Sequence, residues 1–200
     1  MERRLTAILV ADVVGFSRLM GKDEAGTLTA VKGLWNELFG PRVTEYHGRI
    51  VKLMGDGALV EFSSVVDAVK CAIVVQRDAA DRNSESAADK RIEMRIGINL
   101  GDVIIEGDDI YGDGVNVAAR LEKLAKPGGV ALSAMAYEHA AGKIEAEFED
   151  SGEHALKNIE KPIQVYLWSP AIDVENGRDK PKKIEVLPLP EKPSIAVLPF

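Results

Sequence analysis

The sequence has a single cysteine, Cys71, and no long hydrophobic run. One cysteine excludes a disulfide within the chain and is typical of a reducing compartment. No apolar stretch reaches the roughly 18–20 residues that a membrane-spanning helix needs. No signal-peptide pattern precedes the first apolar segment, which starts directly after the letters MERR. We therefore expect a cytoplasmic domain without a membrane segment.

Acidic residues outnumber basic ones, and histidine is scarce. The formal net charge of −7 and the pI of about 5.1 argue against a general binder of nucleic acid or anionic membranes. His47, His139 and His154 share no metal-ligand spacing, so we expect structural or surface roles for them. The 200 residues suffice for one domain with a sizeable core and a tail. A polyanionic ligand would have to bind a local cluster of positive side chains.

The most informative stretch is 48–62, with the letters GRIVKLMGDGALVEF. Two apolar runs flank 54–57, and an Asp-Gly pair between alternating hydrophobic residues predicts a β-hairpin. Asp56 then lies at the tip between two glycines, which allow a ligand to approach the backbone closely.

The first strand of this hairpin carries a lysine among apolar residues. Strand alternation predicts Val51 and Leu53 on one face, and Ile50, Lys52 and Met54 on the other. A charge among apolar neighbours is costly unless it meets a partner. An ordinary hairpin with a snorkelling lysine is the alternative interpretation.

A second acid, Asp12, interrupts a buried strand. The continuous apolar run 5–14 predicts that strand, and the turn 15–17 after it leads into a helix. Free backbone N–H groups at such a turn bind anions. Two carboxylates at neighbouring strand ends repel by about 4 kcal/mol at ~4 Å and an effective dielectric near 20. A divalent cation reverses that sign, and carboxylate oxygens suit Mg²⁺ or Mn²⁺, so Asp12 and Asp56 are the candidate metal site.

The rest of the chain predicts alternating helices and strands. Leu28, Val31, Trp35 and Leu38 recur at helical spacing and predict a core stripe. Further expected elements are a helix 63–82, strands 91–100 and 102–106 joined by a turn at 100–102, a glycine-rich loop 107–114, a helix 115–125, a strand 130–132, a helix 134–141, and strands 144–148 and 163–168. This order predicts an α+β domain with a ferredoxin-like βαββαβ core and an extra C-terminal β/α block.

The expected helix 115–125 has two different faces. Val117 and Leu121 mark its buried stripe, whereas Asn116 and Arg120 repeat at i, i+4 on another face. A solvated polar stripe is the ordinary interpretation. The glycine-rich loop ends at the N-terminus of this helix, however, which makes Asn116 and Arg120 candidate anion contacts.

Four segments together resemble the catalytic domain of class III nucleotidyl cyclases, and adenylyl cyclases in particular. They are ADVVGFSRLM (11–20), VKLMGDGALVEF (51–62), MRIGINLGDV (94–103) and DIYGDGVNVAARLE (109–122), and they follow the family's order within 4–169. A weaker resemblance links the chain to GGDEF-type diguanylate cyclases. The hairpin tip here has the letters MGDGA, which argues against that second family.

The resemblance implies a set of metal and phosphate contacts. Asp12 and Asp56 match the two aspartates that hold two Mg²⁺ or Mn²⁺ ions, and the carbonyl of Val13 is a possible further ligand. Arg95 matches an arginine that binds the triphosphate. The turn that receives the β- and γ-phosphates on its backbone comprises Val13, Val14, Gly15, Phe16 and Ser17.

The resemblance also implies how the purine and ribose are bound. Lys52 and Asp109 match the pair that recognises adenine: a lysine donates to a ring nitrogen, and a carboxylate accepts from the exocyclic amine, which guanine lacks at that position. Asn116 matches a residue that orients the ribose, and Arg120 matches the arginine that stabilises charge at the α-phosphate.

The implied reaction is an intramolecular phosphoryl transfer in ATP that releases pyrophosphate without a covalent intermediate. Lys157, in the letters HALKNI, matches a phosphate-contacting lysine of the last hairpin, and Lys161 is the alternative because this loop differs from the usual one. No side chain in the motifs is an obvious general base.

The family builds its active site from two chains. The metal-binding aspartates come from one protomer, and the purine pair, the asparagine and the arginine come from the other. This sequence supplies both halves, so we expect a homodimer with two composite sites.

The composition changes from about Pro170. Residues 180–193, KPKKIEVLPLPEKP, are typical of an extended linker, and 194–200, SIAVLPF, predict the first strand of another region. We expect a cyclase domain at 1–169, a linker at 170–193, and at 194–200 the start of a C-terminal region absent from this chain. Similar junctions precede tetratricopeptide-type regions in longer bacterial cyclases.

Three other functions are compatible with parts of the sequence. A guanylyl cyclase typically has a glutamate and a small polar residue in place of Lys52 and Asp109. A catalytically silent domain could bind nucleotide and regulate the missing region, but it would not need the full motif set. A purely structural ferredoxin-like module leaves the polar motif residues unexplained.

Overall fold

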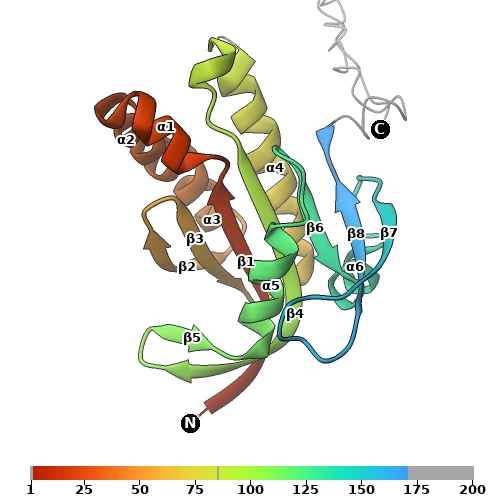
Figure 1. The fold of residues 1–200 in the computed structure, drawn as a ribbon. Coiled ribbons are helices and arrows are strands. Elements are labelled where there is room, and N and C mark those ends of the chain that lie inside the picture. Colours follow the sequence, from red (N-terminus) through yellow and green to blue (C-terminus); the bar gives the residue numbers. More distant parts are fainter. Residues whose placement is uncertain (1, 85, 171–200) are drawn as a thin grey trace, which may run out of the picture.

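One mixed sheet of eight strands organises residues 2–84 and 86–170, the part of the chain that the computed structural model describes. Its strand order is β2-β3-β1-β4-β6-β8-β7, and β5 pairs with the far end of β4 (Figure 1). The strands are β1 (Glu2–Val13), β2 (Gly48–Met54), β3 (Gly57–Phe62), β4 (Met94–Glu106), β5 (Asp109–Tyr111), β6 (Val130–Ser133), β7 (Glu149–His154) and β8 (Ile163–Trp168). The helices are α1 (Phe16–Lys22), α2 (Glu24–Gly33), the π-helical η1 (Leu34–Phe39), α3 (Gly40–Glu45), α4 (Val65–Ser84), the 3₁₀ turn η2 (Ala88–Lys90), α5 (Asp113–Glu122) and α6 (Ala134–Ala140).

The first four strands confirm the predicted α+β class with a ferredoxin-like core. β1 lies between β3 and β4 and pairs antiparallel with both, and β2 pairs with the outer side of β3. β6 then joins β4 in parallel and leads to the antiparallel pair β8–β7, which is the C-terminal block.

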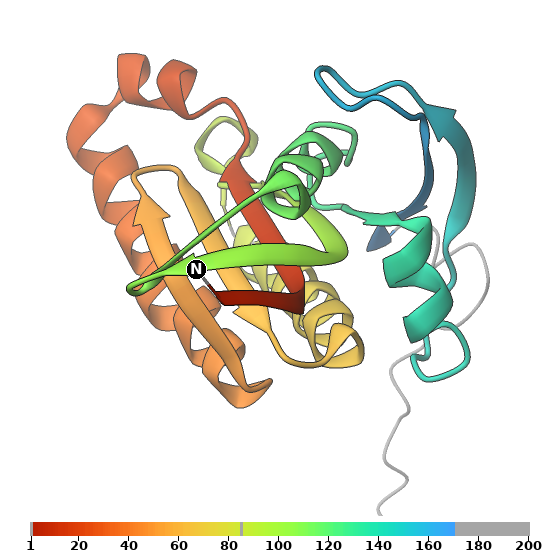
Figure 2. The ribbon, with the colours of Figure 1, turned by 90° about the horizontal axis from the view of Figure 1, so that it is seen from below.

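The two faces of the sheet are covered very differently. Side chains such as Leu9 and Ala11 of β1 pack in one large core with α2, η1, α3, α4 and α6. On the opposite face, Ile8 of β1 and Leu59 of β3 pack with Ala118 of α5. In both ribbon views α5 is the one described helix on this side of the first four strands (Figures 1 and 2).

Glycines let α5 rest directly on β4. A Cβ placed on Gly97 would lie 2.2 Å from the amide nitrogen of Glu122 and 2.3 Å from the carbonyl of Ala118. A Cβ on Gly101 would lie 3.2 Å from the Cα of Gly114. This close approach fixes the height of α5 above the sheet.

The expected turn at 100–102 is wrong. β4 runs unbroken and pairs with β1 from Val13↔Met94 to Glu2↔Ile105. Gly101 provides close contact with α5, not a change of direction. The chain turns instead at 107–108, and the expected glycine-rich loop contains the short strand β5.

Two smaller expectations are also corrected. The alternating residues of 144–148 do not form a strand: Ile144 and Phe148 are partly buried against the core, and the polar segment 149–154 pairs with β8 instead. Leu28 is 41% exposed, because the buried stripe of α2 runs through Thr27 and Val31.

The predicted linker and C-terminal strand lie almost entirely in 171–200, outside the described residues. Within the described part of the chain, no helix combines the length and hydropathy required to cross a membrane.

Candidate functional site

Asp12 and Asp56 lie together at one end of the sheet. Asp12 is the penultimate residue of β1 and pairs with Gly57 of β3, directly after the turn that carries Asp56. The amide of Val13 donates to the carbonyl of Asp56 at 2.9 Å, which ties this turn to the end of β1. The Asp12 Oδ1 lies 3.7 Å from where a Gly57 Cβ would be, so the carboxylate stands directly beside the start of β3.

The electrostatics of Asp12 suit a cation. Burial raises the pKa of Asp12, and the neighbouring charge of Asp56 raises it further, while Arg95 and Lys123 lower it. The described residues contain no cluster of three or more acid, histidine or cysteine ligands. Mg²⁺ is commonly held by one or two carboxylates together with substrate phosphates and water, so this pair fits such an ion.

The turn after β1 presents backbone donors. Gly15 has φ of 66° and precedes α1, so the amides of Phe16 and Ser17 in the first turn have no acceptor within the helix. The amide of Val14, in contrast, donates to the carbonyl of Glu93 at 2.8 Å. Val14 belongs to the predicted phosphate-binding turn, but its N–H is already bonded within the protein and does not point to a phosphate site.

Arg95 and Glu122 lie beside Asp12 on the face that carries α5. Arg95 is the cross-strand partner of Asp12. Its Nε and the Oε1 of Glu122 are both buried and have no hydrogen-bond partner among the described residues. Glu122 is 4% exposed, and burial together with the charge of Asp12 raises its pKa to about 7, against the opposing effect of Arg95 and Lys123.

Sequence reasoning missed Glu122. Ala118, Leu121 and Ala125 are buried, and Glu122 occupies the i+4 position from Ala118 in the same stripe. An acid in an apolar helical stripe was the available signal, but it was hidden because the stripe was assigned through Val117 instead.

Lys52 reaches the site face because of a β-bulge. The register of β2 against β3 shifts between Ile50↔Val60 and Lys52↔Leu59, so Val51 is an extra residue. Ile50 therefore packs in the large core, whereas Lys52 shares the opposite face with Leu59. The expectation that Ile50 and Lys52 share a face is wrong for this reason.

Lys52 and Asp109 form an ion pair. The Nζ of Lys52 donates to Oδ2 of Asp109 and lies 5.7 Å from the centre of the Tyr111 ring. The other carboxylate oxygen of Asp109 accepts from the amide of Ile110 at 2.8 Å. The hydrogen bond from Lys52 lowers the pKa of Asp109, so this carboxylate is ionised at neutral pH. The structure thus brings together two residues that are 57 positions apart.

Asn116 and Arg120 lie one turn apart on α5. Asn116 is exposed, and its backbone N–H donates to the carbonyl of Gly112 at 3.3 Å. The Nε of Arg120 is buried without a partner among the described residues. Asn99 of β4 donates to the carbonyl of Gly114 at 3.1 Å and so fixes the start of the helix.

Lys157 and Lys161 are exposed residues of the loop between β7 and β8. Ile159 between them packs against the cluster that contains Val117 and Leu121 of α5. The loop is therefore anchored beside the helix that carries Asn116 and Arg120. The geometry does not distinguish the two lysines.

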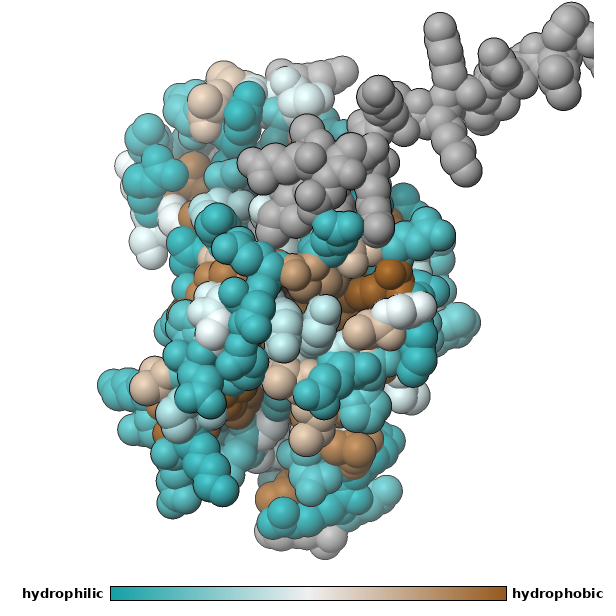
Figure 3. Space-filling model, turned by 90° about the vertical axis from the view of Figure 1, so that its right-hand side faces the viewer, coloured by the Kyte–Doolittle hydropathy of each residue, from teal (hydrophilic) through white to brown (hydrophobic). Residues whose placement is uncertain are grey.

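Exposed hydrophobic side chains gather near Lys52. Leu53, Met54 and Tyr111 are 46%, 51% and 46% exposed. The side of the molecule that carries β7 and β8 is different, because hydrophilic residues dominate it and hydrophobic ones are scattered (Figure 3).

Comparisons with known proteins agree with this geometry. A family model described as the adenylate and guanylate cyclase catalytic domain matches residues 3–169. The protein named "Putative adenylate cyclase 3" of Rhizobium meliloti (strain 1021) is 48% identical over 202 residues, covering 100% of this chain and 34% of that protein. The chain therefore spans about a third of the length of this relative.

Two solved structures show the same chain path. The adenylate/guanylate cyclase/hydrolase from Silicibacter pomeroyi has a TM-score of 0.81 and 41% identity, covering 84% of this chain and 98% of that one. The adenylyl cyclase CyaB from P. aeruginosa has a TM-score of 0.69 and 27% identity, covering 84% and 95%.

Proposed function

The chain belongs to the family of adenylate and guanylate cyclase catalytic domains, and from this premise we propose that it is an adenylate cyclase. In this proposal it converts ATP to 3′,5′-cyclic AMP and pyrophosphate. The observation that carries the choice of ATP is the pair formed by Lys52 and Asp109.

The pair offers adenine a donor beside an acceptor. An ammonium has three donors, and an ionised carboxylate has about four acceptor positions, so each can bind its partner and the base together. Lys52 would donate to a ring nitrogen, and Asp109 would accept from the exocyclic amine. Guanine carries an oxygen in place of that amine and would face the carboxylate with an acceptor.

Asp12 and Asp56 would hold two divalent cations, Mg²⁺ or Mn²⁺, with the carbonyl of Val13 as a further ligand. Bound there, the cations would supply positive charge for the triphosphate and for the ribose 3′-oxygen. The residues proposed to hold the phosphates are Gly15, Phe16, Ser17, Arg95 and Lys157.

The reaction forms one bond and breaks one. The 3′-oxygen of the ribose bonds to the α-phosphorus and its proton passes to water, while the bond from that phosphorus to the pyrophosphate oxygen breaks. Asn116 would orient the ribose, and Arg120 would donate to the oxygens on which negative charge develops. We assign no side chain as the general base.

We further propose that the active unit is a homodimer. The support is the open sheet face: α5 is the only described helix on it, and Met54 and Tyr111 are exposed there beside Lys52. A two-fold dimer would bury these side chains and create two composite sites. Cytoplasmic location and a further C-terminal region stay predictions.

Purine exchange tests the proposed activity. Purified protein is incubated with Mn²⁺ and either ATP or GTP, and cyclic AMP, cyclic GMP and pyrophosphate are quantified over a range of protein concentrations. We expect cyclic AMP to form faster per chain as concentration rises, with GTP a poor substrate. Cyclic GMP as the main product would make the chain a guanylate cyclase, and no product from either purine would favour a silent regulatory domain.

Chain mixing tests the dimer. An Asp56→Ala chain and an Arg120→Ala chain are each expected to be inactive, and a mixture should recover one intact site per heterodimer. No recovery in a verified heterodimer would contradict composite sites.

A further inference from the structure

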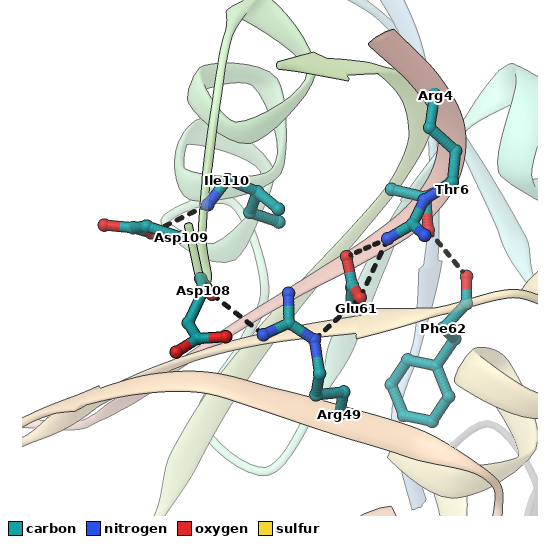
Figure 4. A network of polar contacts seen from close by, with 8 residues as sticks. All are labelled: Arg4, Thr6, Arg49, Glu61, Phe62, Asp108, Asp109 and Ile110. Atoms are coloured by element: carbon teal, nitrogen blue, oxygen red, sulfur yellow. Dashed lines mark hydrogen bonds and ion pairs between the residues drawn. The ribbon is translucent and has the colours of Figure 1, made fainter. Parts of the chain in front are cut away.

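A chain of ion pairs crosses the site face from β1 to β2 (Figure 4). The Nη2 of Arg4 donates to both carboxylate oxygens of Glu61 at 2.9 Å. The Nε of Arg49 donates to Oε1 of the same glutamate at 2.8 Å. Glu61 therefore joins three strands, since Arg4 lies on β1, Glu61 on β3 and Arg49 on β2.

Arg49 also holds the tip of the β4–β5 hairpin. Its Nη1 donates to the carbonyl of Asp108 at 2.8 Å. Asp108 lies in the turn between Glu106 and Asp109, where Gly107 has φ of 62°. The hairpin projects from the far end of β4 and crosses β2 and β3 when seen from below (Figure 2).

The Asp108 carbonyl belongs to the peptide unit that continues into Asp109. A hydrogen bond to this carbonyl therefore fixes the backbone from which the Asp109 side chain departs. Lys52 binds that side chain from the same strand as Arg49. β2 thus holds the purine-pairing acid twice, once by its peptide and once by its carboxylate.

The glutamate keeps Arg49 in place. Glu61 is 9% exposed, and burial alone would raise its pKa. Hydrogen bonds from Arg49 and Arg4 outweigh that effect and lower the pKa, so the carboxylate stays ionised at neutral pH. Charge-assisted bonds to a planar guanidinium set its direction as well as its position.

We propose that Arg49 is a positioning residue for purine selection. Held by Glu61, it sets where the Asp109 carboxylate stands relative to Lys52 and hence how well the pair matches adenine. The inference rests on the proposed function, since it assigns Lys52 and Asp109 to the base. Small displacements matter, because a shift of about 1 Å in a positioned group can cost about 10²-fold in rate.

Arg49→Met tests the proposal, and Arg4→Met is its matched control. Both variants remove one arginine from Glu61, but only Arg49 reaches the hairpin. Steady-state kinetics with ATP and GTP give KM, kcat and the ratio of the two kcat/KM values. Calorimetry with the α,β-methylene analogues of ATP and GTP, which cannot release pyrophosphate, gives the same preference without turnover.

For Arg49→Met we expect KM for ATP to rise about 10-fold with kcat within about threefold, and the ATP preference to fall about 10-fold. For Arg4→Met we expect a lower melting temperature but an ATP preference within about twofold of wild type. Arg49→Lys keeps the charge but loses the planar guanidinium that binds Glu61 and the Asp108 carbonyl together. It should therefore lower the ATP preference as well, and it tests the proposal even if Arg49→Met does not fold.

Two results would overturn the inference. One is an unchanged purine preference in a folded Arg49→Met or Arg49→Lys protein. The other is an equal loss of preference in Arg4→Met, which would reduce the ion pairs to a structural role.

Failure of the proposed function is separable. A wild-type protein that binds the ATP analogue but forms no cyclic nucleotide would contradict the cyclase activity, and the analogue affinities would still test Arg49. An active cyclase whose purine preference is unchanged by substitution of Arg49 would contradict this inference and leave the proposed function intact.

Discussion

The two ends of the site face are built in opposite ways. Around β2 and the β4–β5 hairpin, Lys52 and Asp109 bind each other, and Glu61 binds two arginines. Around the end of β1, the charge of Asp56 acts on the carboxyl of Asp12, and the Nε of Arg95 and the Oε1 of Glu122 are buried without hydrogen-bond partners in the described structure.

The difference shows which part of the site the chain completes by itself. Buried polar atoms normally find a partner, and two of the atoms that lack one in the described structure, on Arg95 and Glu122, lie beside Asp12, so we expect a bound ligand to supply partners there. Cations between the aspartates and anions near Arg95 would supply them. The hairpin end, in contrast, is preorganised before any ligand binds.

Removal of a proposed metal ligand should have the largest effect. For Asp12→Asn we expect cyclic nucleotide formation to fall by about 10³-fold or more. Without metal, the variant should melt at or above the wild-type temperature, because burial and Asp56 both disfavour the charged form of Asp12. Turnover assays with Mn²⁺ and melting curves in EDTA measure the two effects.

Asp108→Asn is the matched control at the hairpin end, where the backbone carbonyl and not the side chain is bound by Arg49. Its activity should stay within about twofold of wild type. An Asp12→Asn protein as active as this control would remove the contrast between the two ends.

Arg120→Ala should come next. We expect turnover to fall about 10²–10³-fold, because one positioned contact to the developing charge is lost. Stability should change little, since the Nε of Arg120 has no partner to lose among the described residues. Paired measurements of kcat and urea unfolding test this, and a folding defect large enough to explain the loss would contradict it.

Glu122→Gln should change how stability depends on pH. The pKa of Glu122 is raised to about 7, so the folded state keeps a proton that the unfolded state releases above an ordinary value near 4.5. Wild-type stability therefore falls as the pH rises between these values, and a glutamine does not share that loss.

Between pH 5 and pH 8 the difference in unfolding free energy should move in favour of the variant by roughly 2–3 kcal/mol. Urea unfolding in EDTA at both pH values gives the number. Parallel pH curves for the two proteins would show that Glu122 is not neutral when buried.

Glu61→Gln should have the smallest effect of this series. Loss of the ionised partner of two half-exposed arginines should cost about 1–2 kcal/mol at pH 7. The folded pKa of Glu61 is lowered, so its contribution is present above the unfolded value near 4.5 and is lost as the pH falls through the folded value. The difference in unfolding free energy between Glu61→Gln and wild type should therefore shrink towards zero in acid. A constant difference down to pH 3 would contradict a stabilising role for the ion pairs.

Much of this architecture could be predicted from local sequence. The Asp-Gly pair before Ala58 identified the hairpin, and the βαββαβ order identified the fold. Lys52 stood out because a charge among apolar residues needs a partner. The prediction that Lys52 pairs with Asp109 came from the family resemblance, since no local pattern specifies a contact over 57 positions.

What the sequence concealed depends on tertiary packing. The bulge at Val51 decides which face Lys52 occupies, and it leaves no mark in the alternation of β2. Gly101 is typical of a turn when viewed locally, yet it supports α5 against a continuous strand. Glu122 was hidden because an acid in a helical stripe is read as surface until its neighbours are known to be buried.

Hydrogen exchange measures the contrast between the two ends most directly. The protein is compared alone and with Mg²⁺ plus α,β-methylene ATP. We predict new protection in peptides that cover 12–18 and 54–57, and no change in those that cover 104–111, where the strand amides are already bonded. Protection gained at the hairpin but absent around Asp12 and Asp56 would contradict a metal and phosphate site at the end of β1.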